Sequence, residues 1–129
     1  MMIDVSSRQD YTSKHGDISQ EVCSVLGLPE EVSNLSMNLW ERLLMDVPRT
    51  PIRLLADCIY LVAFMTGRRV SVPKIADAFL KVTGYRVRVM PKDNRRENTR
   101  WVEDERLHPV ILAVIPDEEA LSFLLSQYP

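Results

Sequence analysis

The segment from Pro51 to Met65, PIRLLADCIYLVAFM, constrains the fold more than any other part of the chain. It is apolar almost all the way around a helical wheel, and only Arg53 and Asp57 interrupt it. A helix of this kind has to be buried on every side. It is too short to span a bilayer, which takes about 20 apolar residues. We therefore expect a mainly α fold in which one central helix, residues 51–66, is surrounded by amphipathic helices.

Capping residues and apolar spacing predict the surrounding helices. Asp17 can cap a helix over residues 18–26, and Pro29 can open a second helix. Ser71 can cap a further helix over residues 72–83, which Gly84 would end. On the central helix, Arg53 and Asp57 are four residues apart and are expected to pair with each other.

The two ends of the chain differ in character. Residues 1–16 are polar and lack periodicity, which predicts a disordered N-terminal arm that includes His15 as a surface residue. Residues 17–90 form the predicted helical domain, and residues 91–129 are expected to pack on it. That last part ends in a predicted helix, which begins near Glu118.

A change of period after Gly84 predicts a β-hairpin. Tyr85, Val87 and Val89 alternate with Arg86, Arg88 and Met90, as in a strand with one buried face. The compact apolar run at residues 110–115 is a candidate second strand. Residues 85–90 and 110–115 could pair, with a charged loop over residues 91–100 between them.

The small net charge of −2 conceals a basic block. Residues 68–100 carry ten basic and three acidic side chains, whereas residues 1–67 and 101–129 are both net acidic. A local cationic patch bears on nucleic-acid binding more than the overall charge does. The basic side chains are Arg68, Arg69, Lys74, Lys81, Arg86, Arg88, Lys92, Arg95, Arg96 and Arg100.

The sequence shows no arrangement of residues that is typical of an enzyme active site or a metal site. Cys23 and Cys58 are far apart, lie in apolar helical patterns and are expected to be buried free thiols. We find no phosphate-binding glycine loop, no nucleophile elbow and no metal-ligand spacing. We expect no enzyme activity, no metal and no cofactor. The N-terminus does not resemble a signal peptide, which predicts an intracellular protein.

Residues 18–88 resemble one cyclin-like repeat of general transcription initiation factor IIB, without that family's zinc ribbon. Three motifs carry the resemblance: LGLPEEV at 26–32, PRTPIRLLADCIYLVA at 48–63 and IADAFLKVTGYRVR at 75–88. The first is similar to the break between two helices of the repeat. The second is similar to the family's central-helix signature. The third is similar to its last two helices.

The resemblance implies a cyclin-like helical bundle and a transcription factor or regulator that binds double-stranded DNA. In that family the last two helices of a repeat form a helix-turn-helix, whose reading segment would begin here near Val82. The TATA-binding protein and RNA polymerase are the implied protein partners. Because factor IIB has two repeats, a homodimer could rebuild the pair, with Leu121, Phe123, Leu124 and Leu125 as the seam.

Two DNA-binding geometries are open at this point: the helix-turn-helix, and a hairpin whose basic loop over residues 91–100 forms a wing. Both use the same side chains, which can hold phosphates or base edges. The candidate DNA-binding residues are Lys74, Lys81, Thr83, Tyr85, Arg86, Arg88, Lys92, Arg95, Arg96 and Arg100. A third alternative is a protein-docking module that binds the transcription machinery without specific contact to DNA.

Overall fold

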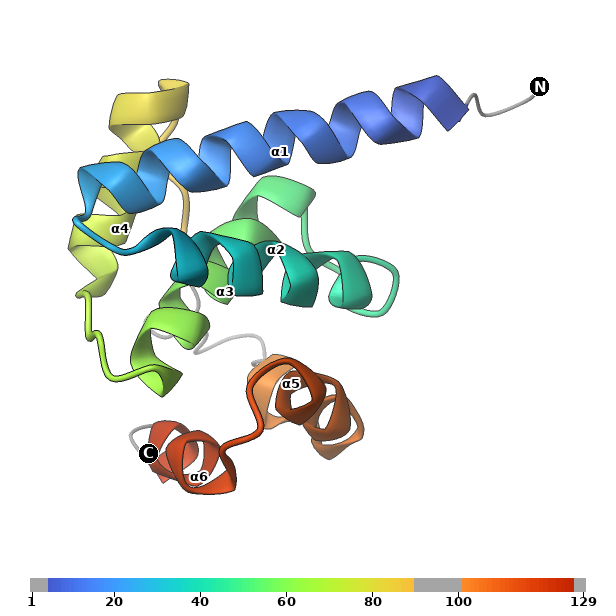
Figure 1. The fold of residues 1–129 in the computed structure, drawn as a ribbon, viewed down its shortest axis with the longest axis vertical. Coiled ribbons are helices and arrows are strands. Elements are labelled where there is room, and N and C mark those ends of the chain that lie inside the picture. The colour runs from blue at the N-terminus through green and yellow to red at the C-terminus, as the bar shows by residue number, and fades with distance from the viewer. Residues whose placement is uncertain (1–4, 90–100, 127–129) are drawn as a thin grey trace.

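The computed structural model describes residues 5–89 and 101–126, with side chains from residue 13 onward, and within these ranges it is mainly helical and contains no strand (Figure 1). No described helix is both long and apolar enough to cross a membrane. The α-helices are α1 (Val5–Val25), α2 (Glu30–Leu43), α3 (Pro51–Met65), α4 (Val72–Thr83), α5 (His108–Val114) and α6 (Glu118–Ser126). Two short 3-10 turns, η1 (Trp101–Glu103) and η2 (Glu105–Leu107), precede α5.

Helix α3 is the centre of the packing, as its sequence predicts. Ten of its fifteen residues are buried, and α1, α2, α4 and α6 all pack against it. Pro51 stands in its first turn, where a missing backbone N–H costs nothing. Its small residues Ala56 and Ala63 are fully buried, so neighbouring helices can approach closely.

Helix α1 begins much earlier than predicted. It starts at Val5 rather than at residue 18, so the segment expected to be a disordered arm is helical from Val5. Its N-terminal part projects beyond the other helices (Figure 1). His15 is buried rather than exposed, because its ring stacks on Trp40 of α2 at a centroid distance of 4.8 Å. This contact between α1 and α2 has no counterpart in the apolar periodicity of the sequence.

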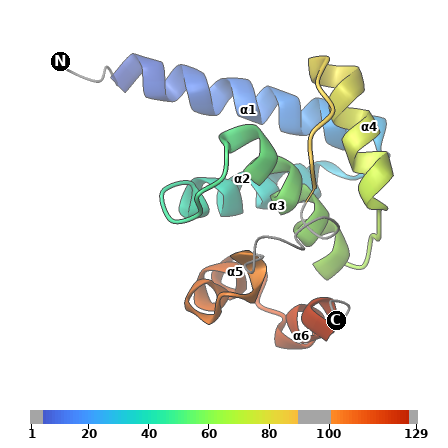
Figure 2. The ribbon, with the colours of Figure 1, turned by 180° about the vertical axis from the view of Figure 1, so that it is seen from behind.

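Helix α4 has the predicted boundaries, and both ends are capped. The Ser71 side chain accepts a hydrogen bond from the Lys74 N–H, 3.4 Å away. Gly84 ends the helix in the left-handed region, with φ 84°, where a side chain would be strained. The chain then turns and runs back in extended form beside α4 and α3 (Figure 2).

The predicted hairpin is wrong in its second strand. Residues 110–115 fall in and just after α5, whose buried residues Ile111 and Val114 lie three apart. Pro109 occupies the first turn of this helix, a position that suits proline. A short apolar run does not by itself distinguish a strand from a buried helix.

Helix α6 packs against α3, which uses much of the surface predicted for a dimer seam. Leu121 and Leu124 are buried within the chain's own core. The Phe123 ring lies 5.6 Å from that of Phe64 on α3, and the Arg69 guanidinium lies over both rings. The homodimer remains a prediction, but these two leucines are not available to form its seam.

Asp57, on α3, is fully buried and joins three parts of the chain. Its carboxylate accepts hydrogen bonds from Arg49 Nη1 at 3.2 Å and from Trp101 Nε1 at 2.9 Å. Arg49 precedes α3, and Trp101 opens the C-terminal part. Arg49, and not the predicted Arg53, forms the ion pair with Asp57. The Asp57 carboxylate faces the core, where Arg49 can approach it from outside α3. Breaking a buried ion pair is costly, since the remaining charge is left unpaired.

Replacing this carboxylate is expected to destabilise the protein strongly. Asp57→Ala should lower the free energy of unfolding by about 3–5 kcal/mol, because it leaves the Arg49 charge buried and unpaired. Trp101→Phe keeps an aromatic side chain but removes the hydrogen bond to a charged group and some buried ring volume, so it should cost at least about 1.5–3 kcal/mol. Urea unfolding followed by circular dichroism measures both. A decrease below about 1 kcal/mol for Asp57→Ala would contradict the assigned role.

Candidate nucleic-acid interface

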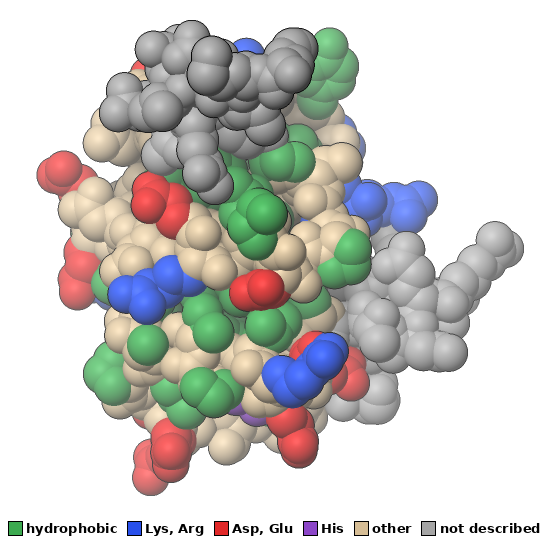
Figure 3. Space-filling view, turned by 90° about the vertical axis from the view of Figure 1, so that its right-hand side faces the viewer, with side chains coloured by type: hydrophobic (Ala, Val, Ile, Leu, Met, Phe, Trp, Pro, Cys, Tyr) green, Lys and Arg blue, Asp and Glu red, His purple; other side chains and the backbone are tan. Residues whose placement is uncertain are grey.

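Positive charge is concentrated on α4 and on the segments that flank it. Residues 68–89 carry six basic side chains and one acidic side chain, Asp77. Arg86 forms an ion pair with Asp77, so the one acidic charge is already compensated. On the side of the molecule opposite α4, acidic and basic side chains are scattered among hydrophobic ones (Figure 3). The cationic surface therefore belongs to the α4 side.

Lys74 and Lys81 lie on the outer face of α4. They are seven residues apart, which separates them by about 10.5 Å along the helix axis and places them on nearly the same face. Both are exposed, and neither makes an ion pair with any residue in the described ranges. Ile75 and Phe79 face the opposite way, into the core. The core contacts of α4 thus fix the direction of its lysines.

The segment after α4 turns Tyr85 and both arginines outward and its two valines inward. Val87 and Val89 are 8% and 6% exposed, whereas Tyr85 is 76% exposed and Arg86 and Arg88 are also exposed. The predicted alternation is confirmed from Arg86 to Val89 but is wrong at Tyr85, which was expected on the buried face, and the described residues contain no strand partner. The ion pair from Arg86 to Asp77 ties this segment to α4.

Of the remaining predicted site residues, the structure describes Thr83, which does not add to this surface. Thr83 Oγ1 donates to the Phe79 carbonyl oxygen at 2.7 Å and accepts from the Tyr85 N–H at 3.2 Å, so its hydroxyl group stabilises the end of α4. Lys92, Arg95, Arg96 and Arg100 lie outside the described residues. The wing predicted over residues 91–100 therefore remains a prediction.

The helix-turn-helix that the resemblance implies is wrong in its second helix, the reading segment. Its reading segment was expected to begin near Val82 and to continue through Arg88. The chain leaves helical geometry at Gly84, and residues 85–89 are extended. Gly84 ends α4 with positive φ, and the residues that follow it do not start a second helix before residue 90. The cations after α4 are thus presented from an extended segment.

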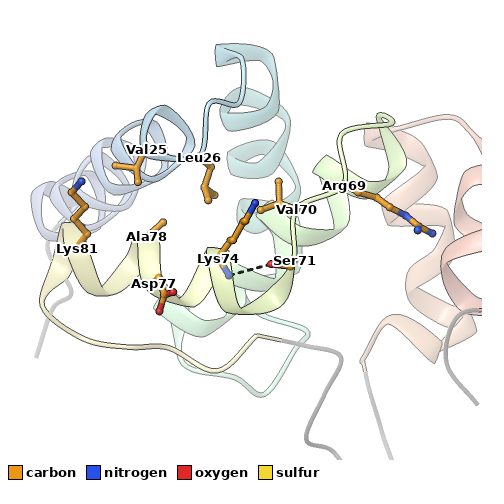
Figure 4. Close-up of a pocket in the computed structure, with 9 residues that line it drawn as sticks. All are labelled: Val25, Leu26, Arg69, Val70, Ser71, Lys74, Asp77, Ala78 and Lys81. Atoms are coloured by element: carbon orange, nitrogen blue, oxygen red, sulfur yellow. Dashed lines mark hydrogen bonds between the residues drawn. The ribbon is translucent and has the colours of Figure 1, made fainter.

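A groove lies between the end of α1 and α4, and the sequence did not reveal it. Its volume is about 480 Å³. Val25 at the end of α1 and Leu26 just after it, with Val70 and Ala78, give it an apolar lining. Its polar lining is Arg69, Ser71, Lys74, Asp77 and Lys81 (Figure 4). The Asp77 carboxylate points away from Val25 and Leu26. Val25 lies within the helix predicted over residues 18–26, but its sequence does not indicate that this side chain remains 45% exposed.

A second hollow, of about 390 Å³, lies between α1 and α2 beside Cys23. Burial raises the pKa of the Cys23 thiol to about 11 from its ordinary 9.0, although hydrogen bonds from Ser19 and Ser33 oppose the shift. Burial and the neighbouring Asp57 carboxylate raise the pKa of Cys58 well above 9.0. Both cysteines are buried and free, as predicted. A thiol with a raised pKa is a poor nucleophile, so this hollow lacks the chemistry of a cysteine active site.

Neither a metal cluster nor a known relative points to a function. Residues 5–89 and 101–126 contain no group of three or more His, Cys, Asp or Glu side chains that could hold a metal ion. No protein-family model, no curated protein and no solved structure matches the chain.

The buried thiols predict a specific dependence of stability on pH. Because the pKa of each thiol is raised on folding, its contribution is fully present below pH 9.0 and falls at higher pH, for Cys23 as the pH rises toward about 11. The double variant Cys23→Ala, Cys58→Ala should show a shallower fall in unfolding free energy over this window. Native protein should also resist a thiol reagent at about pH 8. Equal slopes for parent and variant would refute the assignment.

Proposed function

We propose that the protein binds double-stranded DNA through its phosphate backbone, using a surface made by Lys74, Lys81, Tyr85, Arg86 and Arg88. This set is called the α4 surface below. The observation that carries the proposal is the charge balance of residues 68–89, with six basic side chains and one acidic side chain that is itself paired. Of these six cations, Lys74 and Lys81 come from α4, and Arg86 and Arg88 come from the segment that the Arg86–Asp77 ion pair ties to it, so these four can act on one ligand together.

The side chains of the α4 surface suit phosphates better than base edges. Lysine ammonium groups act as point charges toward phosphate oxygens, and arginine can donate two parallel hydrogen bonds to one phosphate. The exposed Tyr85 hydroxyl group can donate one more. An extended segment beside a helix does not present a reading helix to the major groove. The expected binding is therefore largely independent of sequence.

A role in transcription rests on the resemblance to one repeat of factor IIB. The buried central helix is the feature of that resemblance which the fold shares most directly. The proposed partners are the TATA-binding protein and RNA polymerase, which would supply the sequence selection that the α4 surface lacks. The alternative function, a protein-docking module, has its own support in the groove between α1 and α4.

Removing the arginines after α4 is expected to abolish binding to duplex DNA. The variant with Arg86, Arg88, Arg95 and Arg96 all changed to alanine loses four cations and also exposes the charge of Asp77. Fluorescence anisotropy with a labelled duplex measures the decrease in affinity. For the parent protein, affinity should fall steeply between about 50 and 200 mM salt through counterion release.

Two variants separate the contribution of the α4 surface from that of total charge. Lys74→Ala with Lys81→Ala should weaken binding and reduce the slope of log affinity against log salt by about 0.9 for each phosphate that the variant no longer neutralises. Arg42→Ala removes an exposed cation of α2, which is hydrogen-bonded to Asn38 and lies away from α4 in sequence and fold. It should leave binding unchanged. Parent-like binding by the quadruple arginine variant would exclude the α4 surface as the site.

A further inference from the structure

We infer that the groove between α1 and α4 binds an acidic amphipathic helix of a protein partner. The groove joins an apolar lining to a basic rim, and each of these two features selects one property of the ligand. This inference goes beyond DNA binding and does not depend on it, because the apolar lining has no role in holding phosphates.

The apolar lining calls for hydrophobic side chains on the partner. Val25, Leu26, Val70 and Ala78 line the groove, and Val25 keeps 45% of its surface exposed. Exposed apolar surface that is contiguous and hollowed is a recurrent feature of docking sites. The volume of about 480 Å³ accepts a few aliphatic side chains rather than one methyl group. Burying them removes apolar surface from water on both partners.

The basic rim calls for carboxylates at a defined spacing. Lys74 and Lys81 are about 10.5 Å apart along α4, two turns of the helix. Carboxylates seven residues apart on a partner helix have the same separation, so both ammonium groups can be met by one face of that helix. Asp77 also lines the groove, but its carboxylate points away from Val25 and Leu26 and forms an ion pair with Arg86, so its charge is compensated.

A helix fits this place because two helices already form its walls. Residues at the end of α1 and on α4 line the groove from its two sides (Figure 4). A third helix can bury one apolar stripe in such a hollow while its polar face stays in water. The expected motif has Glu at positions i and i+7, with Leu at i+3 and i+4 between them.

The probe is a fluorescein-labelled synthetic helix of about 20 residues that repeats this motif, long enough to be helical on its own. The parent protein should bind it in an anisotropy titration. A probe with Ser in place of each Leu and a probe with Lys in place of each Glu should both bind at least about tenfold more weakly. If the motif probe binds no better than these two, the inference is wrong.

Variants of the protein test the same groove from the other side. Lys74→Glu with Lys81→Glu should lower the affinity for the acidic probe about tenfold. It should raise the affinity for the lysine probe, because the charges of groove and probe are then exchanged. Val25→Asn should weaken the acidic probe without changing the charge. All three positions are exposed, and circular dichroism checks that the fold is kept. An acidic probe that is insensitive to all of these changes would overturn the assignment.

A matched pair of variants keeps this inference separate from DNA binding. Arg88 lies on the α4 surface but does not line the groove. Arg88→Ala should therefore weaken the binding of duplex DNA and leave the binding of the helix probe unchanged. Val25→Asn should weaken the binding of the helix probe and leave the binding of duplex DNA unchanged. If Val25→Asn weakens the binding of DNA and leaves the binding of the helix probe unchanged, the groove binds nucleic acid and the inference is wrong. If no variant changes the binding of DNA while Val25→Asn weakens the binding of the helix probe, the inference about the groove is supported and the DNA proposal is wrong.

Discussion

The buried carboxylate of Asp57 is the interaction on which the arrangement of the chain depends. A charge at the middle of α3 has to be satisfied inside the core, since transfer of a carboxylate away from water is costly. Arg49 satisfies it from the turn before α3, and Trp101 satisfies it from the start of the C-terminal part. The same carboxylate therefore positions two segments that are 52 residues apart along the chain. The C-terminal helices are held against α2 and α3, and none of the described residues covers Lys74 and Lys81 on α4.

Helix α4 combines two requirements in twelve residues. Ile75 and Phe79 anchor it to the core, which leaves Lys74 and Lys81 facing outward. The lysines belong both to the proposed DNA surface and to the rim of the groove. A duplex and an acidic helix would then compete for the same two charges. A partner that occupies the groove would in this way reduce DNA binding without blocking the segment after α4.

Parts of this structure follow from the sequence, and parts depend on contacts that the sequence does not display. The boundaries of α3 and α4 were predictable, because their apolar patterns and the residues Pro51, Ser71 and Gly84 agree. The extent of α1 was not, since its stabilising contact between His15 and Trp40 joins two helices. The basic side chains near α4 could be identified from charge alone. The groove could not, because it requires the end of α1 and α4, about fifty residues apart in the chain, to lie side by side.

Hydrogen exchange of the Trp101 indole N–H is the most direct test of the role of Asp57. If this N–H is held by the buried carboxylate, it should exchange only when the whole domain unfolds, at the rate shown by the amides in the middle of α3. Two-dimensional NMR in deuterated solvent resolves it from the indole of Trp40. Exchange of the Trp101 N–H within minutes, while the α3 amides remain protected, would contradict the account.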